Sequence, residues 1–108
     1  MIESTRRIIE ALKAVPRGSV SCYRDIALRA GILNGARQVV RILHSMTHKY
    51  DLPWYRIIRA DHRIAFCEGE DRDRQAALLR TEGIKVSKTG KVKTDFYDWN
   101  YAEKPDKR

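Results

Sequence analysis

The sequence lacks any long apolar run. None of its hydrophobic stretches approaches the roughly 18 residues that a membrane-spanning helix needs, and the first residues, MIESTRRII, have no signal-peptide core. We therefore expect a location inside the cell, in the cytoplasm at the nucleoid if the source is bacterial, and no contact with a membrane. Cysteine is also scarce: only Cys22 and Cys67 occur, which is too few for a disulfide framework and fits a reducing compartment.

Acidic residues are too few to balance the basic ones. The chain has 14 Asp and Glu against 22 Lys and Arg, which gives a formal net charge of +8. This surplus favours a polyanionic partner, because a protein that neutralises phosphates releases their counterions. A basic protein that is merely soluble, or one of the ribosomal kind, has the same charge. Composition alone leaves both interpretations open.

Length limits the chain to one hydrophobic core. It has 108 residues, of which 43% are hydrophobic, and it shows no internal repeat or low-complexity run. The last six residues, 103–108, are mostly charged. We predict a single domain over residues 1–102 and a polar C-terminal tail over 103–108.

Apolar spacing predicts three helices in the first half. The first covers residues 4–15, ends before Pro16, and has an apolar face made of Ile8, Ile9, Leu12 and Val15. The second follows Ser21 as N-cap, stops at Gly31, and has a face made of Tyr23, Ile26, Ala27 and Ala30. The third follows Asn34 as N-cap and buries Val39, Val40, Leu43 and Met46.

The second and third helices form a predicted helix-turn-helix. Only Gly31, Ile32 and Leu33 separate them, which is the length of a tight turn between two such helices. Opposite its apolar stripe, the third helix carries polar and mostly basic residues at helical spacing: Arg37, Arg41, His44, Ser45 and His48. A solvated face is the alternative, but without acidic residues this face suits phosphates better.

The second half predicts short strands and one more helix. An extended stretch covers 53–58, a strand lies near 63–66, and a helix capped by Asp71 runs through Leu79 to Gly83. Residues 84–86 and 92–93 flank the turn Lys88-Thr89-Gly90 as a hairpin. The predicted fold is mainly α with short β-strands, a winged-helix-like helix-turn-helix DNA-binding domain.

Three motifs in this order resemble the DNA-binding domain of the O6-alkylguanine-DNA alkyltransferases. They are Val20-Ser21-Cys22-Tyr23, Ala36-Arg37-Gln38-Val39 and Pro53-Trp54-Tyr55-Arg56-Ile57-Ile58. Weaker similarity continues through Asp73-Arg74-Gln75 and Glu82-Gly83-Ile84, so that the resemblance covers roughly residues 5–101. The chain is more similar still to the alkyltransferase-like proteins, which keep this domain and lose the reactive cysteine.

The third motif argues against catalysis. Active transferases read Pro-Cys-His-Arg here, and their cysteine thiolate takes the alkyl group. In this chain Trp54 stands at the cysteine position and Tyr55 at the histidine position. The indole nitrogen is only a hydrogen-bond donor, so the resemblance implies a protein that is not an enzyme and uses no cofactor. Glu82 is expected to keep a structural role.

The resemblance also implies how DNA is held. Arg37 is the finger that enters the minor groove and replaces an extruded base, and the alternative is a phosphate clamp. Tyr23 presses on the phosphate beside the flipped nucleotide; it also fits the apolar stripe of its helix as a core residue. We expect Arg41, His44 and Ser45 to contact the backbone or shallow groove edges.

The same resemblance implies a pocket for the flipped base. Trp54 and Tyr55 line it, with Trp54 as a plain core residue in the alternative interpretation. Pro53 sets the geometry of the loop, and Arg56 is expected to anchor this loop more than to touch the base. On the far wall Arg72 is the expected basic residue, unless Glu70 has replaced it.

The implied function is non-enzymatic recognition of O6-alkylguanine in double-stranded DNA by nucleotide flipping, with nucleotide excision repair proteins as partners of a monomer. One rival is a winged-helix transcription regulator that binds undamaged DNA, although it leaves the motif at residues 53–56 without a purpose. Another is a metal-dependent enzyme that uses His44, His48 and Cys67, for which the sequence shows no further ligand. We therefore predict no bound metal.

Overall fold

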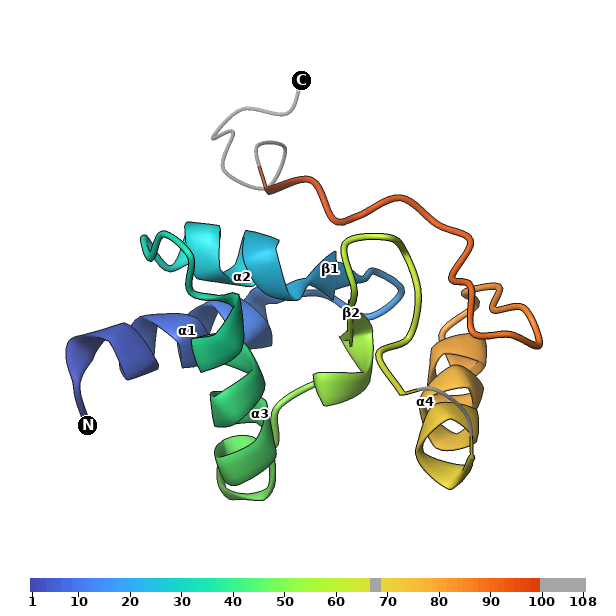
Figure 1. Ribbon diagram of the computed structural model, residues 1–108, viewed down its shortest axis with the longest axis horizontal. Helices are drawn as coiled ribbons and strands as arrows, with labels where there is room; N and C mark the ends of the chain where they lie inside the picture. Colours follow the sequence, from blue (N-terminus) through green and yellow to red (C-terminus); the bar gives the residue numbers. More distant parts are fainter. Residues whose placement is uncertain (67–68, 100–108) are drawn as a thin grey trace.

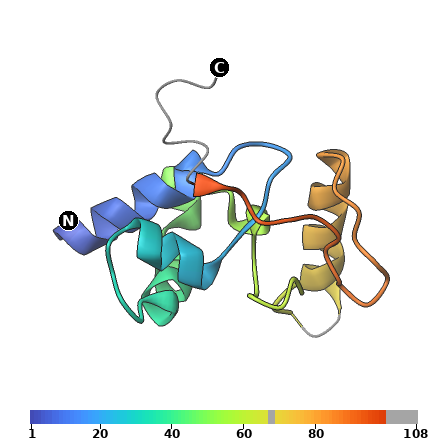
Figure 2. The same ribbon diagram turned by 90° about the horizontal axis from the view of Figure 1, so that it is seen from above.

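A computed structural model describes residues 1–66 and 69–99, and it shows three helices on one side of a small sheet and a fourth on the other side (Figure 1). The first three are α1 (Glu3–Ala14), α2 (Tyr23–Arg29) and α3 (Ala36–Tyr50). The fourth, α4 (Glu70–Thr81), stands apart from them in the view from above (Figure 2). The expected mainly helical, helix-turn-helix type of fold is confirmed. No helix of the described residues combines the length and the apolarity needed to cross a membrane.

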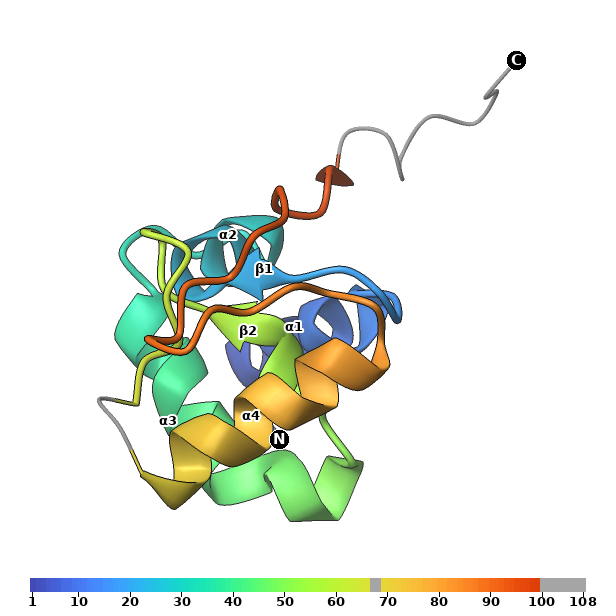
Figure 3. The same cartoon turned by 90° about the vertical axis from the view of Figure 1, so that its right-hand side faces the viewer.

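The sheet between the two groups of helices has two parallel strands. These are β1 (Ser21–Cys22) and β2 (Ile57–Ile58), paired as Ser21 with Ile57 and Cys22 with Ile58. A single 3-10 turn, η1 (Trp54–Arg56), leads directly into β2. Figure 3 shows α4 in front of these strands.

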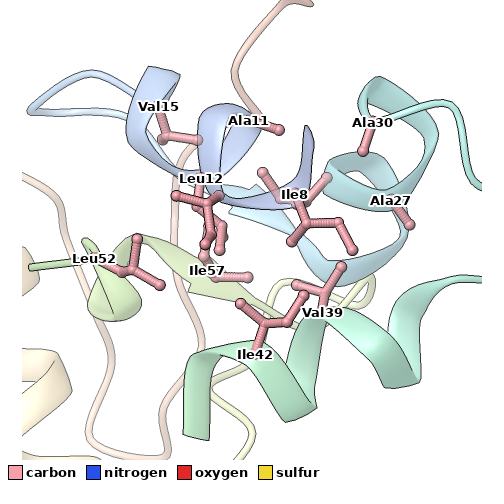
Figure 4. Close-up of a cluster of buried hydrophobic side chains, with 12 residues drawn as sticks. Ile8, Ala11, Leu12, Val15, Ala27, Ala30, Val39, Ile42, Leu52 and Ile57 are labelled. Carbon is pink, nitrogen blue, oxygen red and sulfur yellow. The ribbon is translucent and has the colours of Figure 1, made fainter. Parts of the chain in front are cut away.

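Two buried clusters of side chains lie on either side of the sheet, in place of the single core expected from the chain length. The first joins α1, α2 and α3, with Ile8 and Leu12 of α1 completely buried (Figure 4). The second joins α4 to the segments around it through Ile64, Leu79, Ile84 and Val92. Successive strand residues point to opposite faces, and Ile57 accordingly belongs to the first cluster and Ile58 to the second. Because β2 is buried on both faces, it holds the preceding η1 segment between the two clusters.

The C-terminal segment returns to the sheet after a hairpin. Val86 and Val92 form an antiparallel bridge, and the Ser87 amide donates to the Lys91 carbonyl at 2.9 Å, which confirms the predicted hairpin. Phe96 then pairs in parallel with Val20, next to β1. The predicted tail, residues 103–108, lies outside the described residues, and the proposed domain boundary at 102 stays a prediction.

The N-caps predicted for the second and third helices are wrong. Ser21 belongs to β1, and Cys22 is the residue before α2. Asn34 has a φ of 55° in the left-handed region, and Gly35 is the residue before α3. A Cβ on Gly35 would lie 2.7 Å from Cγ2 of Ile32. Tight packing against the preceding turn therefore selects glycine at this cap, in place of a side chain that accepts a hydrogen bond.

The predicted extended segments are shorter than expected. Residues 54–56 form η1, and only Ile57 and Ile58 are a strand. Around residues 63–66 a single bridge from Arg63 to Lys91 replaces the predicted strand. These extended segments pair through one or two residues each, which is too little to leave a periodic pattern in the sequence.

The N-cap predicted for the fourth helix is also wrong. Asp71 lies inside α4, which begins at Glu70, and Gly69 is the residue before the helix.

Candidate nucleic-acid interface

The outer face of α3 is exposed and mostly basic, as predicted. Arg37 is the second residue of the helix, and Arg41 follows one turn later. Within residues 1–66 and 69–99 neither guanidinium has an acidic partner, and the first turn of α3 contains no acid. All members of the predicted set are exposed: Arg37, Arg41, His44, Ser45 and His48. The Ser45 hydroxyl donates to the Arg41 carbonyl at 2.9 Å, so it is held against its own helix.

Val40 lies on this exposed side of α3 rather than in the core. It is 38% exposed, whereas Ile42 is 5% exposed and packs into the first cluster. The predicted apolar stripe therefore included one wrong residue. Val40 instead lines a cavity beside the helix.

This cavity has a volume of about 320 Å³ and lies where α2, α3, η1 and α4 meet. It is called the α3–α4 cavity below. Helix α3 supplies the largest share of its wall, and α4 supplies charged and amide groups opposite. Its lining residues are Tyr23, Val40, Leu43, His44, Thr47, His48, Trp54, Phe66, Asp71, Arg74 and Gln75.

Trp54 enters the α3–α4 cavity from η1. It is half-buried and is not among the residues packed against either core cluster. Its ring meets that of Tyr55 edge-on, with centroids 5.9 Å apart and planes at 88°. The indole is thus positioned as a wall of the cavity and leaves part of its surface open.

Tyr23 serves the core and the cavity at once. It is the first residue of α2, its ring packs against the first core cluster, and it also lines the cavity. Burial raises the pKa of its phenol. The structure thus confirms that Tyr23 packs against the core, and its contact with a phosphate stays a prediction.

The other predicted pocket residues lie elsewhere. Pro53, Tyr55 and Arg56 line a separate cavity of about 450 Å³, together with Lys13 and Tyr50. Arg72 is also not in the wall of the α3–α4 cavity: its Nη1 donates to the Thr89 carbonyl of the hairpin at 3.3 Å. On the α4 side of this cavity, the basic residue in the wall is Arg74.

Arg56 anchors the loop by binding Glu82. Its Nη2 lies 2.7 Å from Oε2 of Glu82, and its Nη1 donates to the Val15 carbonyl at 3.0 Å. The Gly18 amide donates to Oε1 of the same carboxylate at 2.8 Å. The Glu82 side chain is 1% exposed. One buried carboxylate thus ties the end of α4 to η1 and to the loop after α1.

These contacts determine the charge states around Glu82. Burial alone would raise the pKa of this carboxyl, but the hydrogen bonds from Arg56, Gly18 and Tyr55 together hold it below its ordinary value. For Tyr55, burial first and the bond to Glu82 in addition raise the pKa of the phenol. Near pH 7 the carboxylate is therefore charged and the phenol is neutral.

Gln75 fixes the η1 segment from the side of α4. This side chain is buried, and its Nε2 donates to the carbonyls of Tyr55 at 3.0 Å and Ile57 at 3.1 Å. In the sequence, Gln75 stands out only as part of the weak similarity at Asp73-Arg74-Gln75. Gln75 lies on the same face of the helix as Ala76 and Leu79, which are buried. A glutamine among the apolar positions of a helix was the feature of the sequence that could have identified it.

A metal site is not apparent in the described part of the chain. No group of three metal-ligating side chains occurs there, and Cys67, which the metal hypothesis required, lies outside the described residues. Cys22 is completely buried in β1, and burial raises the pKa of its thiol. That thiol also does not line the α3–α4 cavity.

Known proteins are similar to this chain in sequence. A DNA base-flipping protein of Vibrio parahaemolyticus is 38% identical over 93 residues, covering 86% of this chain and 92% of that protein. Alkyltransferase-like protein 1 of Schizosaccharomyces pombe is 32% identical, covering 92% of this chain and 96% of that one.

A solved structure is also similar. The crystal structure of S. pombe Atl1 in complex with damaged DNA containing O6-carboxymethylguanine matches with a TM-score of 0.73 and 27% identity, over 91% of this chain and 97% of that one. The family model described as the DNA-binding domain of 6-O-methylguanine DNA methyltransferase matches residues 3–84. The chain belongs to this family.

Proposed function

We propose that this protein binds double-stranded DNA containing an O6-alkylated guanine, rotates that nucleotide into the α3–α4 cavity and holds it without removing the alkyl group. The observation that carries this proposal is the position of Trp54 in the wall of a cavity beside the basic face of α3. A regulator of undamaged DNA would use the same helix, but the cavity would have no role in it.

The basic face supplies attraction for the phosphates. The chain carries a net charge of +8, and Arg37 and Arg41 are exposed on α3 without acidic partners in the described residues. Each phosphate contact of this kind releases counterions and makes binding depend on salt. We expect Ser45 and His44 to add contacts to the backbone from the same face.

Arg37 is the proposed finger that replaces the flipped nucleotide. It is exposed in the first turn of α3. Its planar guanidinium can stack between neighbouring bases while it donates hydrogen bonds to the orphaned cytosine, which a lysine ammonium does poorly. Tyr23, at the rim shared by α2 and the cavity, is the proposed contact for the adjoining phosphate.

The cavity offers a flipped base both stacking and polar contacts. Its volume of about 320 Å³ lies in the range of small-molecule sites, about 300–1,000 Å³. An aromatic wall such as Trp54 contributes about 1–3 kcal/mol by stacking on a base. Arg74 is the basic group that we propose for the wall facing the adduct, because it lines this cavity and Arg72 does not. An O6-alkylated guanine pairs poorly, which lowers the cost of extruding it.

Among the described residues no cysteine lines this cavity. Trp54 occupies the position at which the transferases hold their cysteine, and an indole nitrogen offers no lone pair for attack. Cys22 is buried away from the cavity. The protein therefore acts as a sensor, and nucleotide excision repair proteins are the proposed partners of the monomeric complex.

Binding to paired duplexes tests this function. Fluorescence anisotropy at physiological salt compares two duplexes that differ only in one O6-methylguanine, and nucleoside analysis afterwards checks the alkyl group. Tighter binding to the modified duplex with the methyl group intact supports the proposal. Equal affinity for both duplexes would instead support the regulator.

A further inference from the structure

Leu33 is an exposed hydrophobic residue outside both core clusters. It is 80% exposed, more than any other large hydrophobic residue in the described ranges. It lies in the turn between α2 and α3, where a polar residue would cost less in water. A leucine that is exposed to this degree has its side chain available to whatever the turn contacts.

The turn holds Leu33 on a rigid base. On its N-terminal side the Ile32 amide donates to the Ala27 carbonyl at 2.9 Å, and the Ile32 side chain packs against the first core cluster. On its C-terminal side Gly35 is packed so closely that an added Cβ would lie 3.0 Å from that of Ala27. Because Ile32 and Gly35 are both anchored, the backbone at Leu33 loses little freedom when the side chain enters a binding partner.

Leu33 also lies at the same end of α3 as the proposed finger. It precedes Arg37 by four residues, and Arg37 belongs to the first turn of the helix. A duplex that brings its minor groove to Arg37 therefore reaches the turn as well. The exposed guanidinium groups of Arg37 and Arg41 make this end of the helix attractive to a polyanion rather than to an apolar protein surface.

We propose that Leu33 is a wedge that enters the minor groove beside the flipped nucleotide and keeps the adjacent base step unstacked while Arg37 fills the gap. This inference rests on the proposed function. Minor-groove proteins insert apolar side chains between base pairs in this way, at an unstacking cost of a few kcal/mol per step. Burying Leu33 offsets part of this cost only when the step is open, so the residue stabilises the lesion complex more than the undamaged one.

The chain contains a matched control. Leu28, on α2, is 50% exposed and lies outside the turn. Replacing either leucine with alanine removes exposed apolar surface and leaves the core intact. Replacing Leu33 with methionine keeps an apolar side chain of similar volume.

The experiment measures the affinity of the wild type and of Leu33→Ala, Leu33→Met and Leu28→Ala for the paired duplexes, with and without O6-methylguanine. A 2-aminopurine placed next to the lesion reports unstacking of that step by its increased fluorescence. We expect Leu33→Ala to lower affinity for the lesion duplex about tenfold, with a reduced 2-aminopurine signal and less than about twofold change on the undamaged duplex. The other two variants should behave like the wild type.

Three other results would contradict the wedge, and they can be distinguished from one another. Unchanged lesion affinity and 2-aminopurine signal in Leu33→Ala would overturn the wedge and leave the proposed function standing. Equal losses on both duplexes would make Leu33 a general DNA contact and would also overturn it. A wild type that binds both duplexes equally would remove the proposed function itself, and the wedge with it.

Discussion

Arg56 and Glu82 form a bidentate ion pair that joins η1 to the end of α4. Nε of Arg56 lies 3.0 Å from one carboxylate oxygen and Nη2 lies 2.7 Å from the other. The Arg56 side chain is 15% exposed and that of Glu82 is 1% exposed. Because Trp54 stands two residues before Arg56, this pair fixes the backbone from which the indole enters the cavity.

Removing the Glu82 charge should destabilise the protein strongly. Glu82→Gln leaves the Arg56 guanidinium buried without its counter-charge, which costs about 3 kcal/mol or more in buried pairs. Urea denaturation measures the free energy of unfolding. The matched control is Glu10→Gln, which affects an exposed pair with Arg6 and should change stability far less, because solvent screens exposed charges. Losses of equal size in the two variants would contradict the anchoring role.

The same pair predicts a dependence of stability on pH. The folded state holds the pKa of Glu82 below its ordinary value of 4.5, so its contribution is fully present above that value and is lost as pH falls through the lower folded-state pKa. The difference in unfolding free energy between wild type and Glu82→Gln should stay constant from pH 6 to 8 and shrink below about pH 4.5. A difference that stays constant down to pH 3 would show that the Glu82 charge is not responsible.

The two arginines of α3 should affect binding in different ways. Arg37→Ala should lower affinity for the lesion duplex by about 1–3 kcal/mol and remove the preference for it, because the gap left by the flipped base stays empty. Arg41→Ala should weaken binding to both duplexes equally and reduce the salt slope by about one. Salt titrations followed by fluorescence anisotropy separate the two effects. If both variants lose affinity uniformly, Arg37 is only a phosphate contact.

Restoring a cysteine at position 54 should not restore alkyl transfer. A thiol needs a nearby base to become a thiolate. Burial raises the pKa of Tyr55, which keeps its phenol protonated, and the Glu82 carboxylate is already bound to Arg56. After incubation of Trp54→Cys with methylated duplex, intact-protein mass spectrometry should show an unchanged mass. Gain of a methyl group by most of the protein would refute this explanation.

The sequence predicted the positions of the helices well, but it predicted the short strands and the helix caps poorly. The apolar face that contains Ile8 and Leu12 placed the first helix within a residue of α1. Strands β1 and β2 have two residues each, which is too short for an alternating pattern. The cap at Gly35 depends on its contact with Ala27 in the preceding helix, which no local pattern predicts.

The cavity wall illustrates the same limit. Arg72 and Arg74 are two positions apart on α4, and two residues of an α-helix differ by about 200° in direction. Arg72 therefore contacts the hairpin while Arg74 lines the cavity. Only the packing of α4 determines which arginine faces α3, and this packing depends on Ala76 and Leu79 in the second core. The motif at residues 53–56 could not show that its side chains line two separate cavities.

The fluorescence of Trp54 tests the central claim most directly, because this ring is the proposed stacking partner of the flipped base. The chain has two tryptophans, so Trp99→Phe leaves Trp54 as the sole indole. Titration of this variant with the O6-methylguanine duplex should quench and shift the emission, while the undamaged duplex should change it little at equal saturation. Equal changes with both duplexes, or none with the lesion duplex, would contradict flipping into the α3–α4 cavity.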